Sequence, residues 1–182
     1  MKMLVQRVPV STALPFDLAS IKVHSRVDFN DADDDLTNKA WTAAAEVEQF
    51  AQIALLTQTI LVNVFDPNCE RDMLLPIGPV ADDAEIAVTI DGTAFTAFDV
   101  IGGIRPMIRW RDTYLALTPS RIIIEYTAGF GDEADDIPRD LAEAIRDQAA
   151  LHYDGRSPMD AKSLTTSPHM ARVGARYRGV QV

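Results

Sequence analysis

The chain has 182 residues and a formal net charge of −10, with 47% hydrophobic residues and a single cysteine. This length and composition suit one globular domain with its own core. A lone cysteine excludes an internal disulfide, and no run approaches the roughly 18 apolar residues of a membrane span. Residues 1–7 are too short and too interrupted for a signal peptide, so we expect a protein that is made in the cytoplasm and does not enter a membrane.

The charge is distributed unevenly along the chain. Residues 1–155 contain 12 basic and 26 acidic residues, whereas residues 156–182 contain five basic residues and one acidic residue. This asymmetry predicts an acidic body followed by a basic tail. Because binding to a phosphate backbone relies on Lys and Arg, the acidic body is not expected to grip nucleic acid.

Two helices are expected in the first third of the chain. A short one over about 17–26 follows Leu14-Pro15-Phe16, with Asp17 as its N-cap. A longer one over about 31–54 begins at Asn30 or Asp31. Its apolar residues have helical spacing and are mainly alanines: Leu36, Ala40, Ala43, Ala44, Val47, Phe50, Ala51 and Ala54. We predict that Ala40, Ala43, Ala44 and Val47 pack closely against another helix, within or between subunits.

Residues 57–128 change to a β-rich pattern. Strands are expected over residues 57–65, 73–77, 85–90, 94–100, 107–111 and 121–127. Asp91-Gly92 is a turn dipeptide that predicts a hairpin between two of these strands. No helical segment separates the strands, so the sequence indicates an antiparallel insertion rather than a parallel βαβ unit.

A third helix is expected over about 138–153. Gly129 and Gly131 break the preceding strand, and Pro138 suits the first helical turn behind Asp135 or Asp136 as candidate caps. One face of the helix repeats every three or four residues: Ile137, Leu141, Ile145, Ala149 and His152. Gly155 is a plausible terminator.

The tail, residues 157–182, is rich in Pro, Ser, Thr, Gly and Arg and is expected to stay extended or disordered until it binds a partner. Three uses are open: a solubilising extension, a nucleic-acid patch, or docking to a protein partner. Arg beside an aromatic side chain suits nucleic acid, whereas Arg and Tyr among valines suit a protein interface. The residues concerned are Arg172, Val173, Arg176, Tyr177, Arg178, Val180 and Val182.

These elements predict an α+β fold. Residues 1–156 would form a three-helix core with an inserted antiparallel β-subdomain, and residues 157–182 would form an extended basic C-terminal arm.

Motifs for chemistry are absent from the sequence. The spacing of Asp31, Asp33 and Asp35 starts like a calcium loop, but the glycine and glutamate that such a loop requires are missing. Gly129-Phe130-Gly131 has the outline of a dinucleotide loop, but four carboxylates follow it and no βαβ unit surrounds it. The three histidines lie far apart in sequence, with no spacing that suggests zinc. We expect no enzyme activity, no cofactor and no metal.

Three segments together resemble the head–tail connector (adaptor) proteins of tailed bacteriophages, a family that includes the equivalent proteins of gene transfer agents. Residues 14–28 are similar to the family's opening helix and its arginine-containing exit. Residues 47–59 are similar to the second helix running into the first strand. Residues 126–153, from Tyr126-Thr127-Ala128-Gly129 through Ile137-Pro138, are similar to the end of the folded core. The order and spacing of the segments span most of the chain.

The resemblance implies a structural role in a virion or phage-like particle. It implies a homo-oligomeric ring of about a dozen copies beneath the portal, which extends the DNA channel and carries the next tail component. The tail of this chain is longer and more basic than is usual in the family. Two alternatives remain open at this point: a small cytoplasmic ligand-binding module, and a nucleic-acid-binding regulator that uses the basic tail.

Overall fold

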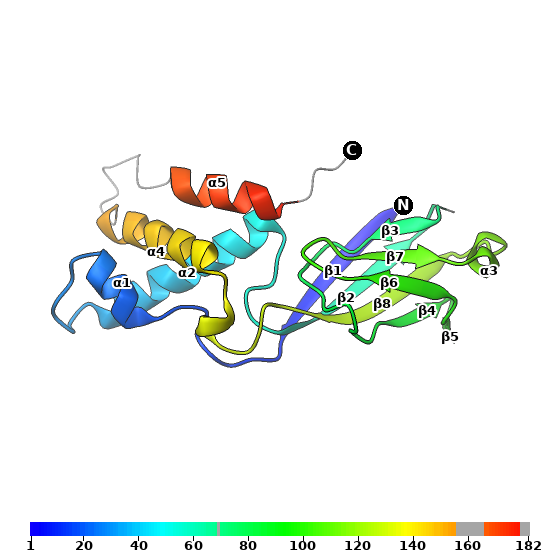
Figure 1. The fold of residues 1–182 in the computed structure, drawn as a ribbon, viewed down its shortest axis with the longest axis horizontal. Coiled ribbons are helices and arrows are strands. Elements are labelled where there is room, and N and C mark those ends of the chain that lie inside the picture. Colours follow the sequence, from blue (N-terminus) through cyan, green and yellow to red (C-terminus); the bar gives the residue numbers. More distant parts are fainter. Residues whose placement is uncertain (69, 156–165, 179–182) are drawn as a thin grey trace. The chain divides into compact units, whose positions relative to one another are not determined.

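The fold is α+β, as predicted, and consists of two compact units (Figure 1). The computed structural model describes residues 1–68, 70–155 and 166–178. Each unit combines two separate stretches of the chain: residues 1–12 and 57–129 form a β unit, and residues 13–56 and 130–182 form a helical unit. No described helix is long and apolar enough to cross a bilayer.

The β unit contains two antiparallel sheets. The larger has the order β1-β2-β8-β4-β5, formed by Lys2–Pro9, Gln58–Phe65, Arg121–Ala128, Ala87–Ile90 and Thr93–Ala94. The smaller has the order β3-β7-β6, formed by Asp72–Leu74, Met107–Trp110 and Phe98–Ile101. A short helix, α3 (Asp112–Leu115), follows β7.

Buried and exposed side chains alternate along the central strands, and the buried ones form the core of this unit. In β2 and β8 every second residue is buried, including Ile60, Val62, Ile122 and Ile124, so one face of the sheet is apolar. The phenol of Tyr126 on that face donates to the Ile77 carbonyl at 3.0 Å. A buried hydroxyl therefore has a partner, and burial raises the pKa of Tyr126 well above its usual range.

The Asp91-Gly92 hairpin is confirmed. Ile90 pairs with Thr93, and both turn residues have positive φ, as a two-residue hairpin turn requires. The Asp91 carboxylate accepts hydrogen bonds from the Ser120 hydroxyl at 2.6 Å and from the Ser120 and Arg121 backbone amides, which lowers its pKa.

Two expectations about the strands are wrong. The single strand expected over 94–100 is divided between β5 and β6, which belong to different sheets. The N-terminal residues, for which no element was expected, form β1 against β2, with Lys2 opposite Phe65 and Pro9 opposite Gln58. Val, Leu and Met alternate irregularly there with Lys, Gln and Arg, so the usual period of two is weak.

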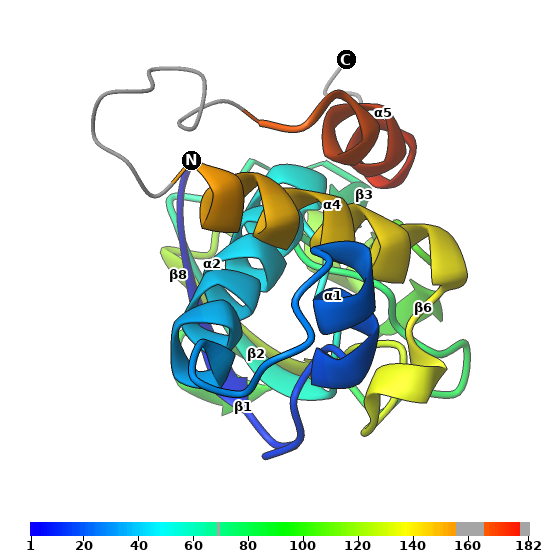
Figure 2. The ribbon, with the colours of Figure 1, turned by 90° about the vertical axis from the view of Figure 1, so that its left-hand side faces the viewer.

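The described residues of the helical unit form a bundle of four helices (Figure 2). They are α1 (Leu18–His24), α2 (Asp33–Ala51), α4 (Arg139–Asp154) and α5 (Pro168–Tyr177). Helix α4 packs against α1, α2 and α5, and α2 also packs against α1 and α5. The apolar faces of all four helices meet in one core.

The expected caps are partly correct. Asp17 caps α1, accepting from the Ala19 and Ser20 amides at 3.1 Å. Helix α2 instead starts after Ala32, whose methyl side chain cannot cap it, and the Asp33 carboxylate binds the Lys22 ammonium at 2.6 Å. Neither Asp135 nor Asp136 caps α4.

Before α4, residues Ala134–Asp136 form a 3₁₀ turn, η1, and Pro138 occupies the N-cap position of α4. The Asp136 carboxylate folds back onto the Asp132 and Glu133 amides at 3.0 and 3.1 Å. It therefore caps this turn rather than the helix that follows.

The expectation of a three-helix core with an extended arm is also wrong. Part of the tail, Pro168–Tyr177, is a fourth helix of the bundle. Met170 and Val173 are buried in the common core. Burial of this apolar face against α2 and α4 offsets the entropy of ordering a polar segment.

The alanine row of α2 gives a testable packing constraint. Ala44 is buried in the core, whereas the neighbouring Ala45 is exposed. We expect Ala44→Leu to overpack the core and lower the free energy of unfolding by roughly 1–3 kcal/mol. Ala45→Leu, the matched control, should change it by less than about 0.5 kcal/mol. Urea denaturation measures both, and equal effects would contradict the assigned facing of α2.

Candidate partner-binding site

Local signals define the start of α5. The Ser167 hydroxyl accepts from the Met170 amide at 2.9 Å, and Pro168 stands in the first turn, where its missing N–H costs nothing. The Ser167 amide donates to the side-chain oxygen of Gln148 at 2.8 Å. Because Gln148 is buried within α4, this bond fixes the N-terminal end of α5 on its neighbour.

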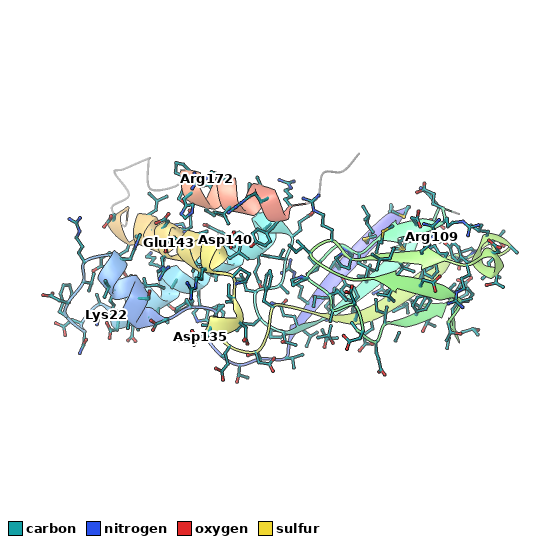
Figure 3. The ribbon with its side chains drawn as sticks, in the orientation of Figure 1. Lys22, Arg109, Asp135, Asp140, Glu143 and Arg172 are labelled. Atoms are coloured by element: carbon teal, nitrogen blue, oxygen red, sulfur yellow. The ribbon has the colours of Figure 1, made fainter. Side chains whose placement is uncertain are left out.

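The C-terminal end of α5 is fixed at the first turn of α4. The Asp140 carboxylate accepts from the Arg176 guanidinium and from the Tyr177 hydroxyl, both at 2.9 Å. The Tyr177 ring also meets the Phe130 ring edge-on, with centroids 6.2 Å apart. Both ends of α5 are therefore attached to the same helix. Figure 3 labels Asp140 on α4 and Arg172 on α5.

Gly174 allows α5 to approach α2 closely. A Cβ at this position would lie 2.5 Å from the Phe50 ring, nearer than side chains tolerate. On the same side, the Arg178 guanidinium lies over the Phe50 ring at 5.7 Å. The glycine is thus required by packing, which explains its place in the middle of a helix.

The structure brings five of the seven predicted partner-binding residues onto or just beyond α5. Arg172, Arg176 and Arg178 are exposed, and Tyr177 is half-buried. Val173 is fully buried and faces the bundle core. Val180 and Val182 lie outside the described residues.

The predicted packing residues of α2 share one face. Ala40, Ala43, Ala44 and Val47 are all buried. The face belongs to the bundle core that α4 and α5 complete, so their small side chains serve contacts within this chain.

A cluster of histidines and carboxylates joins three helices. The Asp147 carboxylate contacts His24 Nε2 at 2.9 Å and His169 Nδ1 at 2.5 Å, so two histidines that are far apart in sequence share one carboxylate. Glu143 lies 3.9 Å from His24 and also pairs with Arg146. These contacts attach α1 and α5 to α4. Residues 24, 147 and 169 are too distant in sequence for any spacing rule to detect them.

The third histidine lies elsewhere on α4. His152 Nε2 contacts the Glu46 carboxylate at 2.9 Å, and Gln148 donates to the same carboxylate at 2.8 Å. This connects α4 to α2. Each of the three neighbouring helices thus makes at least one polar side-chain contact with α4.

Comparison with solved structures gives consistent matches over nearly the whole chain. The chain is similar to one from the neck of an empty gene transfer agent particle computed with six-fold symmetry, with 26% identity and a TM-score of 0.76. It is similar to one from the virion of a native gene transfer agent, with 26% identity and a TM-score of 0.75. A third, from the neck of a native particle computed with twelve-fold symmetry, has 27% identity and a TM-score of 0.73.

Each match covers 98% of this chain and 97% of the other chain. No protein-family profile and no curated protein matches the sequence. The fold and these likenesses define a structural component of a phage-like particle. Within that class, the likenesses support a head–tail connector-type protein of the kind found in the necks of gene transfer agent particles.

The contact between Tyr177 and Asp140 predicts a pH dependence. Burial, and then the neighbouring Asp140, raise the pKa of Tyr177 to about 12. Because the folded state favours the protonated phenol, its contribution to stability is complete below the ordinary pKa near 10 and is lost as pH rises toward about 12.

We therefore expect wild type to unfold at a higher temperature than Tyr177→Phe at pH 8, and the difference to vanish by about pH 12. Thermal unfolding of both proteins between these pH values is the measurement. Subtracting the variant removes the contribution of Tyr126, which titrates in both proteins. A difference that does not change with pH would contradict the assigned contact.

Proposed function

We propose that this chain forms a ring of about a dozen copies beneath the portal, where it extends the DNA channel and joins the head to the next tail component. The observation that carries the proposal is its likeness, over 98% of its length, to chains from necks computed with six-fold and twelve-fold symmetry. A cyclic assembly places identical surfaces side by side around one axis, which suits a channel. The role needs no catalytic step.

The charge of the chain supports a channel through which DNA slides. The net charge is −10, and 26 of the 27 acidic residues precede residue 156. Proteins that hold DNA neutralise several phosphates with Lys and Arg, at an affinity that falls steeply with salt. An acidic lumen wall would repel the backbone and let the DNA pass without sequence recognition.

We propose that the portal binds the outer face of α5 and the residues that follow it. Arg172, Arg176 and Arg178 are exposed there, and arginine is enriched in protein interfaces. Val180 and Val182 lie outside the described residues and are included in the proposal from the sequence alone. Val173 has an indirect role: its buried side chain holds α5 on the bundle.

Because α5 is part of the bundle core, truncating the tail is a less informative test of portal binding than substituting its exposed residues. Truncation after Gly155 would remove Met170 and Val173 from the core, and fully burying such side chains stabilises a fold by roughly 1.5–3 kcal/mol each. A truncated chain that failed to bind would therefore report on folding as well as on docking. Substitution of exposed arginines keeps Met170 and Val173 in the core, and thermal unfolding of the variant then measures what the contacts of Arg176 and Arg178 contribute to folding.

We expect the triple variant Arg172→Gln, Arg176→Gln and Arg178→Gln to copurify with its portal at least tenfold less than wild type. The three guanidinium groups supply the proposed contacts, and a ring multiplies each weak contact by avidity. The remaining binding should weaken further as salt rises, because exposed charge interactions are screened.

A matched control carries the same change in charge on the β unit. Arg105, Arg109 and Arg111 are also exposed, and their replacement by Gln should leave portal binding unchanged. If both triple variants lost portal binding equally, the loss would be due to the change in net charge and not to the position of the arginines. If the α5 variant bound the portal as well as wild type does, the portal interface would not include the arginines of this helix. Steeply salt-dependent binding of wild type to DNA would favour a nucleic-acid role for the tail.

A further inference from the structure

Strand β1 has an open outer edge. It lies at the end of the five-stranded sheet and pairs with β2 on one side (Figure 1). No strand among the described residues pairs with its other side. The strand is eight residues long, whereas the opposite edge strand, β5, has only two. An open edge of this length is a ready template for a strand of another chain.

The register identifies which backbone groups face outward. Val10 donates to the Thr57 carbonyl at 3.1 Å, continuing the pairing in which Pro9 lies opposite Gln58. Bonds of this kind recur at every second residue of an antiparallel pair, so even-numbered residues of β1 face β2. The amides of Met3 and Val5 therefore point to the open edge. Pro9, which lacks an amide proton, has the same outward orientation.

The side chains of β1 add apolar surface to this edge. Leu4 is 64% exposed and Val8 47% exposed, and Val5 and Val10 are exposed as well. Leu4 and Val8 lie opposite Asn63 and Thr59, on the outer face of the sheet. A strand with exposed apolar residues next to an unpaired backbone edge would favour aggregation unless something covers it.

The distribution of charge along the chain indicates which partner covers the open edge of β1. Residues 1–16 contain Lys2 and Arg7 and no acidic residue, whereas the rest of the chain has a net charge of −12. A second copy of this chain is therefore an electrostatically complementary neighbour for the β1 segment. The solved necks that contain similar chains were computed with six-fold and twelve-fold symmetry, and such symmetry repeats a chain around one axis.

We propose that β1 is a contact between adjacent copies in the ring, in which its open edge and its exposed Leu4 and Val8 are covered by the neighbouring subunit. The contact adds a strand of the next copy to the sheet, as in β-augmentation. This inference rests on the proposed ring and identifies the surface that closes it.

Two measurements test the contact in particles from a host that makes the full-length chain. A photo-activated cross-linking residue at position 4 should yield a product of twice the chain's 20 kDa mass, made of two copies of this protein. The same labelled chain, purified and diluted, should give none. Hydrogen exchange at the Met3 and Val5 amides should be slow in the particle and fast in the diluted chain.

The neighbouring amides of Leu4, Gln6 and Val8 are the internal control. They bond to β2, so their exchange should be slow in both states. Fast exchange at Met3 and Val5 in the particle, or cross-links only to other proteins, would overturn the β1 contact. Absence of the labelled chain from the neck would instead overturn the proposed function.

Substitution of Leu4 and Val8 by Thr should reduce incorporation into necks, while Leu74→Thr, at another exposed strand position, should not.

Discussion

The arrangement of the helical unit depends on α4, because each of the other described helices packs against it. Its apolar face packs against α1, α2 and α5, and its polar residues hold the ends of those helices. Asp140 binds the end of α5, Gln148 binds its start, and Asp147 contacts histidines of α1 and α5. Apolar burial supplies most of the stability of such a bundle, and the partly buried polar contacts fix how the helices align.

The position of α5 changes how the basic tail is understood. A disordered arm would become ordered only when it binds its partner, and the entropy lost on ordering would weaken the binding. Here part of the tail is already helical and presents its arginines from a fixed surface. A preorganised helix loses less entropy on docking, so a few exposed side chains can form an effective interface.

Local rules predicted the features that local chemistry determines. Asp17 as a cap, the alanine face of α2 and the Asp91-Gly92 turn each depend on residues within a few positions of one another. The start of α5 had equally local signals in Ser167-Pro168 and in the spacing of Met170, Val173 and Tyr177, but the surrounding polar composition obscured them. The pairing of β1 with β2 and the histidine contacts at Asp147 join segments more than 20 residues apart, so sequence patterns alone could not reveal them.

We propose that this chain links the head to the tail in its particle. The most direct measurement is electron cryomicroscopy of necks from particles made with and without the gene for this chain. We expect a ring of this fold beneath the portal in the first sample, and heads separated from tails in the second. Complete tailed particles with an unchanged neck in the absence of the chain would contradict it.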